Sequence, residues 1–240
     1  MSSRTARRGG PHPRLRDRQG GRRTFGRGSG SSDPGRPGRR PRDGDAWQRS
    51  ARPRAAALPR PTTFAALAPW TPAFAATPVR LATLTTRRNE TSPLSRLKPL
   101  AYLDSVLGMA EARRAGADDG LFLNTRGAVA STTMANIFAV IDGEIATPAI
   151  EDGVLAGTIR ALLLDRGAIA GLPVRARTIE PATLRGASEV FMTNSVRLVC
   201  PVTALDGTQL AAGPVARVAL AAVVASIATE CGDALDRLGA

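Results

Sequence analysis

The fold is decided by residues 127–160, which read GAVASTTMANIFAVIDGEIATPAIEDGVLAGTIR. Within this stretch, Asp142-Gly143 favours a tight turn between two strands. Gly157 precedes a segment whose apolar periodicity predicts a helix from Thr158 to about Ala168. Short apolar segments bounded by turn residues predict three strands, at Ala128–Ala130, Ile137–Ile141 and Glu144–Ala146. Strands and a helix therefore alternate within one short part of the chain.

The same alternation extends on both sides of this stretch. Five further strands are expected, at Val79–Thr86, Leu121–Leu123, Val174–Thr178, Val190–Thr193 and Leu198–Leu205. Three further helices are expected, from Pro99 to about Ala115, at Pro181–Arg185 and from Ala216 to about Thr229. Because strands outnumber helices but are interleaved with them, the sequence predicts an α+β domain over residues 79–240, with an antiparallel or mixed sheet.

The helix expected after Pro99 carries an apolar stripe. Its members are Leu100, Leu103, Val106, Leu107 and Ala110. Residues at this spacing share one face of a helix. We therefore expect this face to be buried and to anchor the segment that precedes the helix.

The first 60 residues differ in composition from the rest of the chain. They hold 17 Arg and 4 Asp, whereas residues 61–240 hold 16 basic and 16 acidic residues. They also contain few aliphatic side chains, so they cannot bury enough apolar surface to offset the entropy of ordering. We predict a disordered basic tail over residues 1–60 and an Ala/Pro-rich linker over residues 61–78. The charge of the whole chain thus gives no reason to expect a nucleic-acid partner for the folded part.

Four explanations of the tail compete. A nucleic-acid-binding arm would need more aromatic side chains than Phe25 and Trp47. A transit peptide would need an amphipathic helix, which the prolines and glycines disfavour. Arg22-Arg23 resembles a twin-arginine export signal, but no apolar segment follows it. We favour the fourth explanation, in which GC-rich DNA was translated out of frame or from a wrong start, and rereading the upstream DNA in the other frames tests it.

Histidine and cysteine usage narrows the chemistry of the folded part. The only histidine, His12, lies in the tail, so residues 61–240 cannot form Ser-His-Asp, Cys-His or histidine-based metal sites. Cys200 and Cys231 lie outside any metal-binding spacing and favour a reduced, cytoplasmic protein. The longest apolar run near the C-terminus, Val218–Ala228, is shorter than the roughly 20 residues that a membrane span needs. We expect neither a metal nor a membrane.

Lys98 is the only lysine among the 33 Lys and Arg residues. Arginine can replace lysine as a positive charge, but its guanidinium stays protonated and cannot act as an amine nucleophile. A single retained lysine is therefore a candidate for Schiff-base chemistry with a carbonyl compound such as pyridoxal phosphate (PLP). The alternative is a lysine retained by chance on a solvated face.

Three polar segments could form a binding site. Gly157 lies just before a helix whose first turn offers free N–H groups that suit a phosphate, although a simple turn is the alternative. Thr193–Ser195 follows a strand and can donate hydroxyl and backbone hydrogen bonds to an anion, with a strand-end turn as the alternative. Ser131–Asn136 could line a cofactor ring or be an ordinary loop.

Together these motifs resemble those of the fold-type IV PLP enzymes, the class IV aminotransferases. This family includes branched-chain and D-amino acid aminotransferases and 4-amino-4-deoxychorismate lyase. The resemblance covers about residues 79–220 and rests on RLKPLAYLDSVLGMAEARRAGADDGLFLN, on the stretch quoted first, and on SEVFMTNSVRLVCPVTALDG. It implies the large C-terminal domain of such an enzyme, with a mixed or antiparallel sheet or barrel flanked by helices, PLP as cofactor and a homodimer.

The resemblance also implies roles for individual residues. Lys98 matches the lysine that forms the Schiff base with PLP. The backbone amides of Thr158 and Ile159 match the cradle for the cofactor phosphate. Ser195, followed by Val196, matches a second phosphate contact.

Two features depart from the family pattern. Ser131 stands where the family usually has a glutamate that pairs with the protonated pyridine nitrogen, and a serine cannot hold that proton by charge. Another acid could substitute for it, or the enzyme is weak. Relatives also carry a small N-terminal domain with a phosphate-binding arginine and part of the substrate pocket, which residues 1–60 do not resemble. Asn136 matches a family asparagine that is either a cofactor contact or a structural turn residue.

Three functional hypotheses follow. The first is a PLP-dependent aminotransferase that transfers an amino group between an amino acid and a 2-oxo acid, or a lyase that releases pyruvate from aminodeoxychorismate. Thr193–Arg197 looks slightly more like the lyase-type and D-amino-acid-type members. The second is a truncated, catalytically impaired family member. The third, a basic nucleic-acid-binding module with an inert domain, is the least expected.

Overall fold

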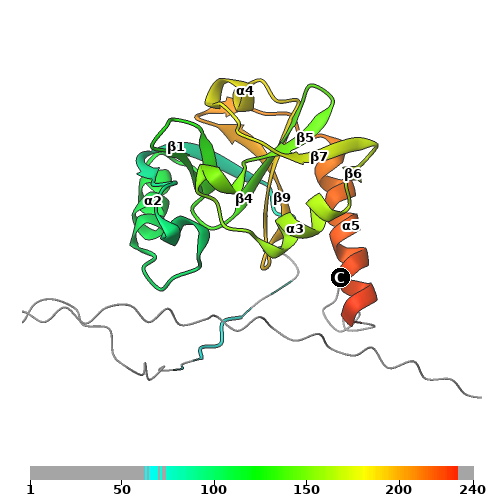
Figure 1. Ribbon diagram of the computed structural model, residues 1–240, viewed down its shortest axis with the longest axis horizontal. Helices are drawn as coiled ribbons and strands as arrows, with labels where there is room; N and C mark the ends of the chain where they lie inside the picture. Colours follow the sequence, from blue (N-terminus) through cyan, green and yellow to red (C-terminus); the bar gives the residue numbers. More distant parts are fainter. Residues whose placement is uncertain (1–62, 64, 70, 72–73, 232–240) are drawn as a thin grey trace, which may run out of the picture. The chain divides into compact units, whose positions relative to one another are not determined.

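The computed structural model of the chain describes residues 63, 65–69, 71 and 74–231. The predicted tail over residues 1–60 lies outside them. Contacts divide the chain into two units, Met1–Phe64 and Ala65–Ala240. The second unit contains every helix and strand that the described residues form (Figure 1).

A ten-stranded mixed sheet forms the centre of this unit. The strands are β1 (Val79–Arg88), β2 (Asp119–Asn124), β3 (Val129–Thr132), β4 (Asn136–Ile141), β5 (Glu144–Thr147), β6 (Ala168–Ile169), β7 (Leu172–Ala176), β8 (Glu189–Asn194), β9 (Leu198–Leu205) and β10 (Thr208–Gln209). Their order is β3-β2-β1-β9-β8-β4-β5-β7-β6, with β10 paired to β9. The β1–β2, β1–β9 and β5–β7 pairs are parallel and the others are antiparallel. The predicted α+β class with a mixed sheet is therefore confirmed.

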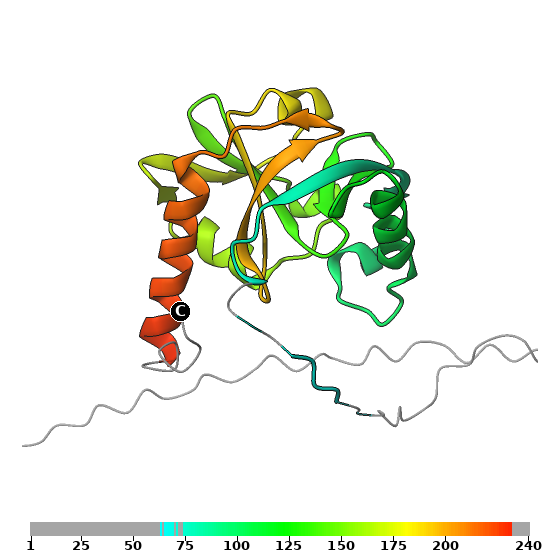
Figure 2. The ribbon, with the colours of Figure 1, turned by 180° about the vertical axis from the view of Figure 1, so that it is seen from behind.

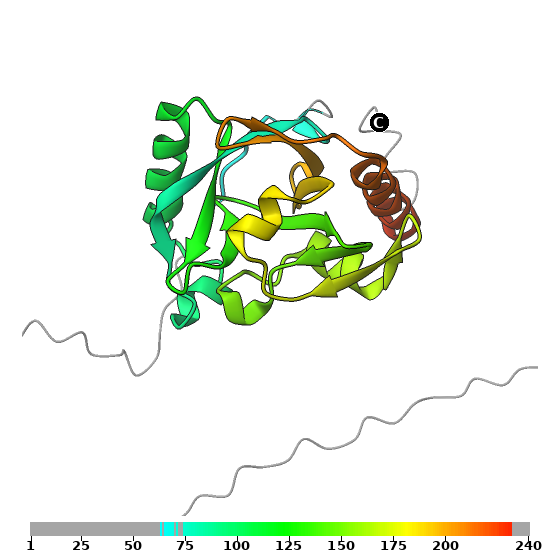
Figure 3. The same ribbon diagram turned by 90° about the horizontal axis from the view of Figure 1, so that it is seen from above.

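Helices cover the sheet on several sides. They are α2 (Leu103–Arg114), α3 (Thr158–Asp165), α4 (Pro181–Arg185) and α5 (Pro214–Cys231), with short 3-10 turns η2 (Pro93–Arg96) and η3 (Ile150–Asp152). Figures 1 and 3 show α2 and α5 on opposite sides of the sheet. Figure 2 shows β1 and β9 side by side between these two helices. The helix predicted from Thr158 thus forms, and it ends three residues earlier than expected.

Three apolar clusters hold these layers together. One fills the curled sheet beneath α4 and includes Ile179 and Leu184. A second lies between the sheet and helices α3 and α5, where the rings of Phe138 and Phe191 stack with centroids 5.1 Å apart. The third joins α2 to β1 and β2 and includes Leu84 and Phe122.

Helix α2 contradicts the predicted burial of its apolar stripe. The helix begins at Leu103 and not directly after Pro99, and its buried residues are Ser105, Gly108 and Ala112. Four members of the stripe are between 54% and 88% exposed, namely Leu100, Leu103, Val106 and Leu107, which we call the exposed stripe. The reason lies at Gly108, where a Cβ atom would come within 2.7 Å of Leu84 Cδ1. Only small residues let the helix approach the sheet this closely, so the apolar face turns outward.

Helix α5 is longer than the apolar run recognised in the sequence. Its 18 residues have a mean hydropathy of 1.5, enough by length and composition to cross a membrane. Val215, Ala216, Ala219 and Val223 pack into the cluster under this helix. Core helices of soluble proteins meet the same criterion, so the expected absence of membrane binding stays a prediction.

Candidate active site

A cavity of about 970 Å³ lies between α2, the start of α3 and the β8–β9 turn. Every site residue predicted from the sequence lines it: Lys98, Ser131, Asn136, Thr158, Ile159, Ser195 and Val196. These residues come from segments far apart in the chain. The sheet order therefore brings the separate sequence motifs to one place.

Lys98 lies in the segment between β1 and α2, residues 89–102, which we call the lysine segment. Its side chain is exposed, and its Nζ atom lies 5.3 Å from the ring centroid of Tyr102. The Tyr102 hydroxyl donates a hydrogen bond of 3.1 Å to the carbonyl oxygen of Thr133. This bond ties the start of α2 to the loop that follows β3.

The N-terminus of α3 forms the opposite wall of the cavity. Gly157 caps the helix without a side chain, so no side-chain hydrogen bond satisfies its first N–H groups. The Thr158 Oγ1 and Ser195 Oγ atoms lie 3.1 Å apart across this end. Uncapped N–H groups, two hydroxyls and the positive end of the helix dipole together suit a phosphate group.

Asn136 sets the turn that leads into α3. Its Nδ2 atom donates a 2.9 Å hydrogen bond to the carbonyl oxygen of Leu155. A Cβ atom on Gly157 would collide with the Asn136 Oδ1 atom. The side-chain amide is thus occupied in shaping the phosphate end of the cavity, which favours the structural role over a direct cofactor contact.

The β8–β9 turn is organised by Asn194. Its Oδ1 atom accepts hydrogen bonds from the backbone N–H groups of Val196 at 3.0 Å and Arg197 at 2.7 Å. These bonds fix the turn that presents the Ser195 hydroxyl to α3. Val196 itself has a 57% exposed side chain and lines the cavity.

Ser131 is 8% exposed and lies at the cavity wall. Its hydroxyl donates to the carbonyl oxygen of Thr132 at 3.0 Å. The loop after it is held by the buried Asp119, whose Oδ1 atom accepts a 2.5 Å hydrogen bond from the Thr133 hydroxyl. Asp119 does not line the cavity, whereas the acids Asp104 and Asp118 do.

Arg88 and Tyr102 are among the cavity residues that the sequence did not single out. Tyr102 could have been found, because it is the only tyrosine and follows the only lysine by four positions. Arg88 gave no such signal among so many arginines. Its guanidinium lies 4.3 Å from the ring centroid of Phe122, and burial lowers the pKa of Arg88 below its ordinary value.

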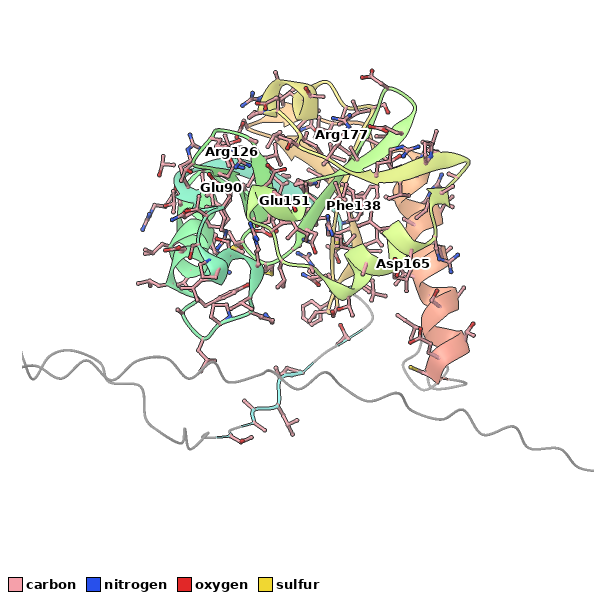
Figure 4. All side chains as sticks on the ribbon, viewed as in Figure 1. Glu90, Arg126, Phe138, Glu151, Asp165 and Arg177 are labelled. Carbon is pink, nitrogen blue, oxygen red and sulfur yellow. The ribbon has the colours of Figure 1, made fainter. Side chains whose placement is uncertain are left out.

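A polar clamp joins the lysine segment to the loop before α3. The Glu90 carboxylate accepts hydrogen bonds from Thr125 N at 3.0 Å and Thr125 Oγ1 at 2.8 Å. Arg126 lies beside Glu90 in Figure 4 and forms a 2.9 Å ion pair with the buried Asp152. The pKa of Glu90 is lowered by hydrogen bonds that its carboxylate accepts from the Glu90 backbone N–H and from the Thr125 hydroxyl. The clamp thus fixes both walls of the cavity relative to each other.

This arrangement defines a class of site: an accessible primary amine and an uncapped helix N-terminus that line one cavity. The family described as amino-transferase class IV matches residues 44–205. The chain therefore belongs to the class IV aminotransferase family, and the resemblance drawn from the motifs is confirmed.

Individual relatives support the same assignment. The chain is 33% identical over 112 residues to the branched-chain-amino-acid aminotransferase of Escherichia coli, covering 47% of this chain and 36% of that protein. It is 32% identical over 123 residues to the aminodeoxychorismate lyase of Bacillus subtilis, covering 51% and 42%. The PLP form of the branched-chain amino acid aminotransferase from Thermobaculum terrenum superposes with a TM-score of 0.58 at 28% identity, covering 62% and 50%. The chain spans only about a third to a half of the length of the curated relatives it matches.

Proposed function

We propose that this chain acts as a PLP-dependent class IV aminotransferase, which transfers an amino group between an amino acid and a 2-oxo acid. The observation that carries the proposal is the shared cavity of Lys98 and the Thr158–Ser195 pair. Family membership and the PLP form of a structural relative support PLP as the cofactor.

The residues around the cavity fit this cofactor. The uncapped N–H groups of Thr158 and Ile159 and the hydroxyls of Thr158 and Ser195 would hold the phosphate. When bound, PLP supplies an electrophilic carbon for an amine and a ring that withdraws electrons from the substrate carbon. The Lys98 Nζ atom would bind that carbon until the substrate amine takes its place. The freed Lys98 amine would then remove a proton from the substrate as a base and return a proton as an acid.

Absorbance after addition of PLP tests this proposal. We expect a visible band that Lys98→Ala and Lys98→Arg both abolish, because arginine keeps the charge but not the nucleophile. Removing the hydroxyls at Thr158 and Ser195 should weaken PLP binding, whereas Thr208→Val, on the exposed strand β10, should not. A visible band that persists without Lys98 would refute the assignment.

The lyase is a second candidate, which the turn Thr193–Arg197 favours. Arg197 lines the cavity, and within the described residues its Nε atom is buried without a hydrogen-bond partner. Such a cation suits a substrate with a second carboxylate, as aminodeoxychorismate has. Release of pyruvate from this compound, compared with release of 2-oxo acids from amino acids, decides between the two reactions.

Oligomeric state, location and catalytic strength belong to the proposal as well. The exposed stripe supports a homodimer, because apolar surface of this kind favours association. Cysteine usage supports a cytoplasmic protein. Ser131 supports a weakened enzyme. Sedimentation tests the dimer, and the steady-state rate of amino-group transfer tests the weakened activity.

A further inference from the structure

Arg88 is a cavity residue whose guanidinium, within the part of the chain that the structure describes, is not engaged by a protein acceptor. It ends β1, is half-buried, and stacks on the Phe122 ring at 4.3 Å. Among the described residues its guanidinium donates no hydrogen bond and forms no close ion pair, and Asp104 attracts it from the first turn of α2. A guanidinium carries five N–H donors and accepts none. The N–H donors of Arg88 are therefore available to an acceptor bound in the cavity.

The guanidinium of Arg88 and the hydroxyl of Ser131 border the same part of the cavity. Phe122 and Ser131 face each other across the antiparallel β2–β3 pair. Directly opposed residues point to the same face, with Cβ atoms about 4.5–5.5 Å apart. Since Arg88 covers the Phe122 ring, Arg88 and Ser131 lie on the same face of the sheet, and both residues line the cavity.

Charges on the cavity wall favour a bound acceptor. The other ionisable side chains that line the cavity are Arg87, Lys98, Tyr102, Asp104, Arg113, Asp118 and Arg197. Of the two acids, Asp118 is ion-paired with Arg80, and Asp104 is exposed on the first turn of α2. Asp104 and Tyr102 attract Arg88 electrostatically. Over the cavity as a whole, five cationic side chains face two acids, and this excess of positive charge disfavours protonation of a weak base bound there.

We propose that Arg88 donates a hydrogen bond to the pyridine nitrogen of the bound cofactor and keeps that nitrogen unprotonated. The proposal rests on the proposed function. In the usual family member a glutamate at the position of Ser131 holds a proton on this nitrogen. Here a permanent cation replaces that carboxylate, so the nitrogen can only accept. The ring then withdraws electrons less strongly than in relatives that carry the glutamate.

Nitrogen NMR of the full chain loaded with PLP, labelled with ¹⁵N in the ring, tests the proposal. Free labelled PLP, titrated across its ring pKa, calibrates the protonated and unprotonated shifts. We expect an unprotonated nitrogen at pH 7 in the native chain and a protonated one in Ser131→Glu. Arg88→Met should raise the pH at which the nitrogen takes up its proton, whereas Arg114→Met, an equal loss of charge at the exposed end of α2, should not.

Three results would overturn the proposal. These are a protonated nitrogen at pH 7 in the native chain, an unchanged titration in Arg88→Met, or the same shift in Arg88→Met and Arg114→Met. A Lys98-dependent visible band accompanied by any of them leaves the proposed function standing. Failure of PLP to give that band overturns both.

The melting temperature of the cofactor-free chain tests the Arg88–Ser131 contact separately. Ser131→Glu introduces a carboxylate beside an unpaired guanidinium, so it should lower the melting temperature less in the native chain than in an Arg88→Met background. An equal effect in both backgrounds would show that the two positions are not in contact and would overturn the geometry on which the proposal depends.

Discussion

Replacing Gly157 with alanine tests how the phosphate end of the cavity is built. The new Cβ atom would collide with Asn136 Oδ1, so the Asn136 side chain must rotate and give up its hydrogen bond to Leu155 O. Loss of one hydrogen bond costs about 0.5–1.5 kcal/mol. A strained rotamer adds about 0.5–1.5 kcal/mol. The expected loss of unfolding free energy is therefore about 1–3 kcal/mol, or about 2–12 °C in Tm for a domain of this size.

Urea unfolding and thermal melts of the cofactor-free chain measure this loss. Gly186→Ala is the matched control, because a Cβ atom there would meet nothing closer than Thr183 O at 3.7 Å. That substitution should be neutral or stabilise by up to about 1 kcal/mol. In an Asn136→Ala background the cost of Gly157→Ala should fall to the smaller penalty that alanine carries relative to glycine at an N-cap, since the colliding atom is gone. Equal costs for Gly157→Ala in both backgrounds, or equal costs at both glycines, would refute the reasoning.

Three further predictions concern other parts of the fold. Gly108→Val should lower the unfolding free energy by about 1–3 kcal/mol, because its side chain overpacks against the sheet. Leu103→Gln, on the exposed side of the same helix, should change it by less than about 0.5 kcal/mol. Urea unfolding measures both. A thiol reagent at pH 8 should modify one cysteine quickly in the native chain, Cys231, and reach Cys200 only after unfolding, because burial raises the pKa of the Cys200 thiol; two fast thiols would contradict this. The pKa of Glu90 is lowered in the folded chain, so its stabilising effect is complete above the ordinary carboxyl pKa of about 4.3 and is lost as the pH falls through the folded value. Glu90→Gln should therefore flatten the acid side of a plot of unfolding free energy against pH. An unchanged plot would argue against the clamp.

Most of the fold follows from local patterns in the sequence. Turn residues and short apolar runs located β4, β5 and α3 to within three residues at each end, because these elements lie in a core that demands continuous apolar side chains. The sequence also predicted the site motifs, and the structure brings all of them to one cavity.

Features that depend on close approach could not be predicted. The apolar period of α2 indicates an amphipathic helix, but which face is buried depends on the distance to the sheet, and Gly108 makes that distance too short for leucine. Arg88 was missed for a related reason. Its importance comes from a contact with Phe122 on a neighbouring strand and from the lack of an acceptor, and neither is visible along the chain.

The single lysine has a practical consequence for anyone who handles this protein. Aldehydes such as PLP also react with surface amines, and in most proteins this background obscures the stoichiometry of loading. Here Lys98 carries the only ε-amine. Borohydride reduction followed by mass spectrometry should therefore place a label at Lys98 or at the α-amino group of the chain, and the label at Lys98 counts the loaded sites. Lys98 is thus the only side-chain amine at which such a label can form.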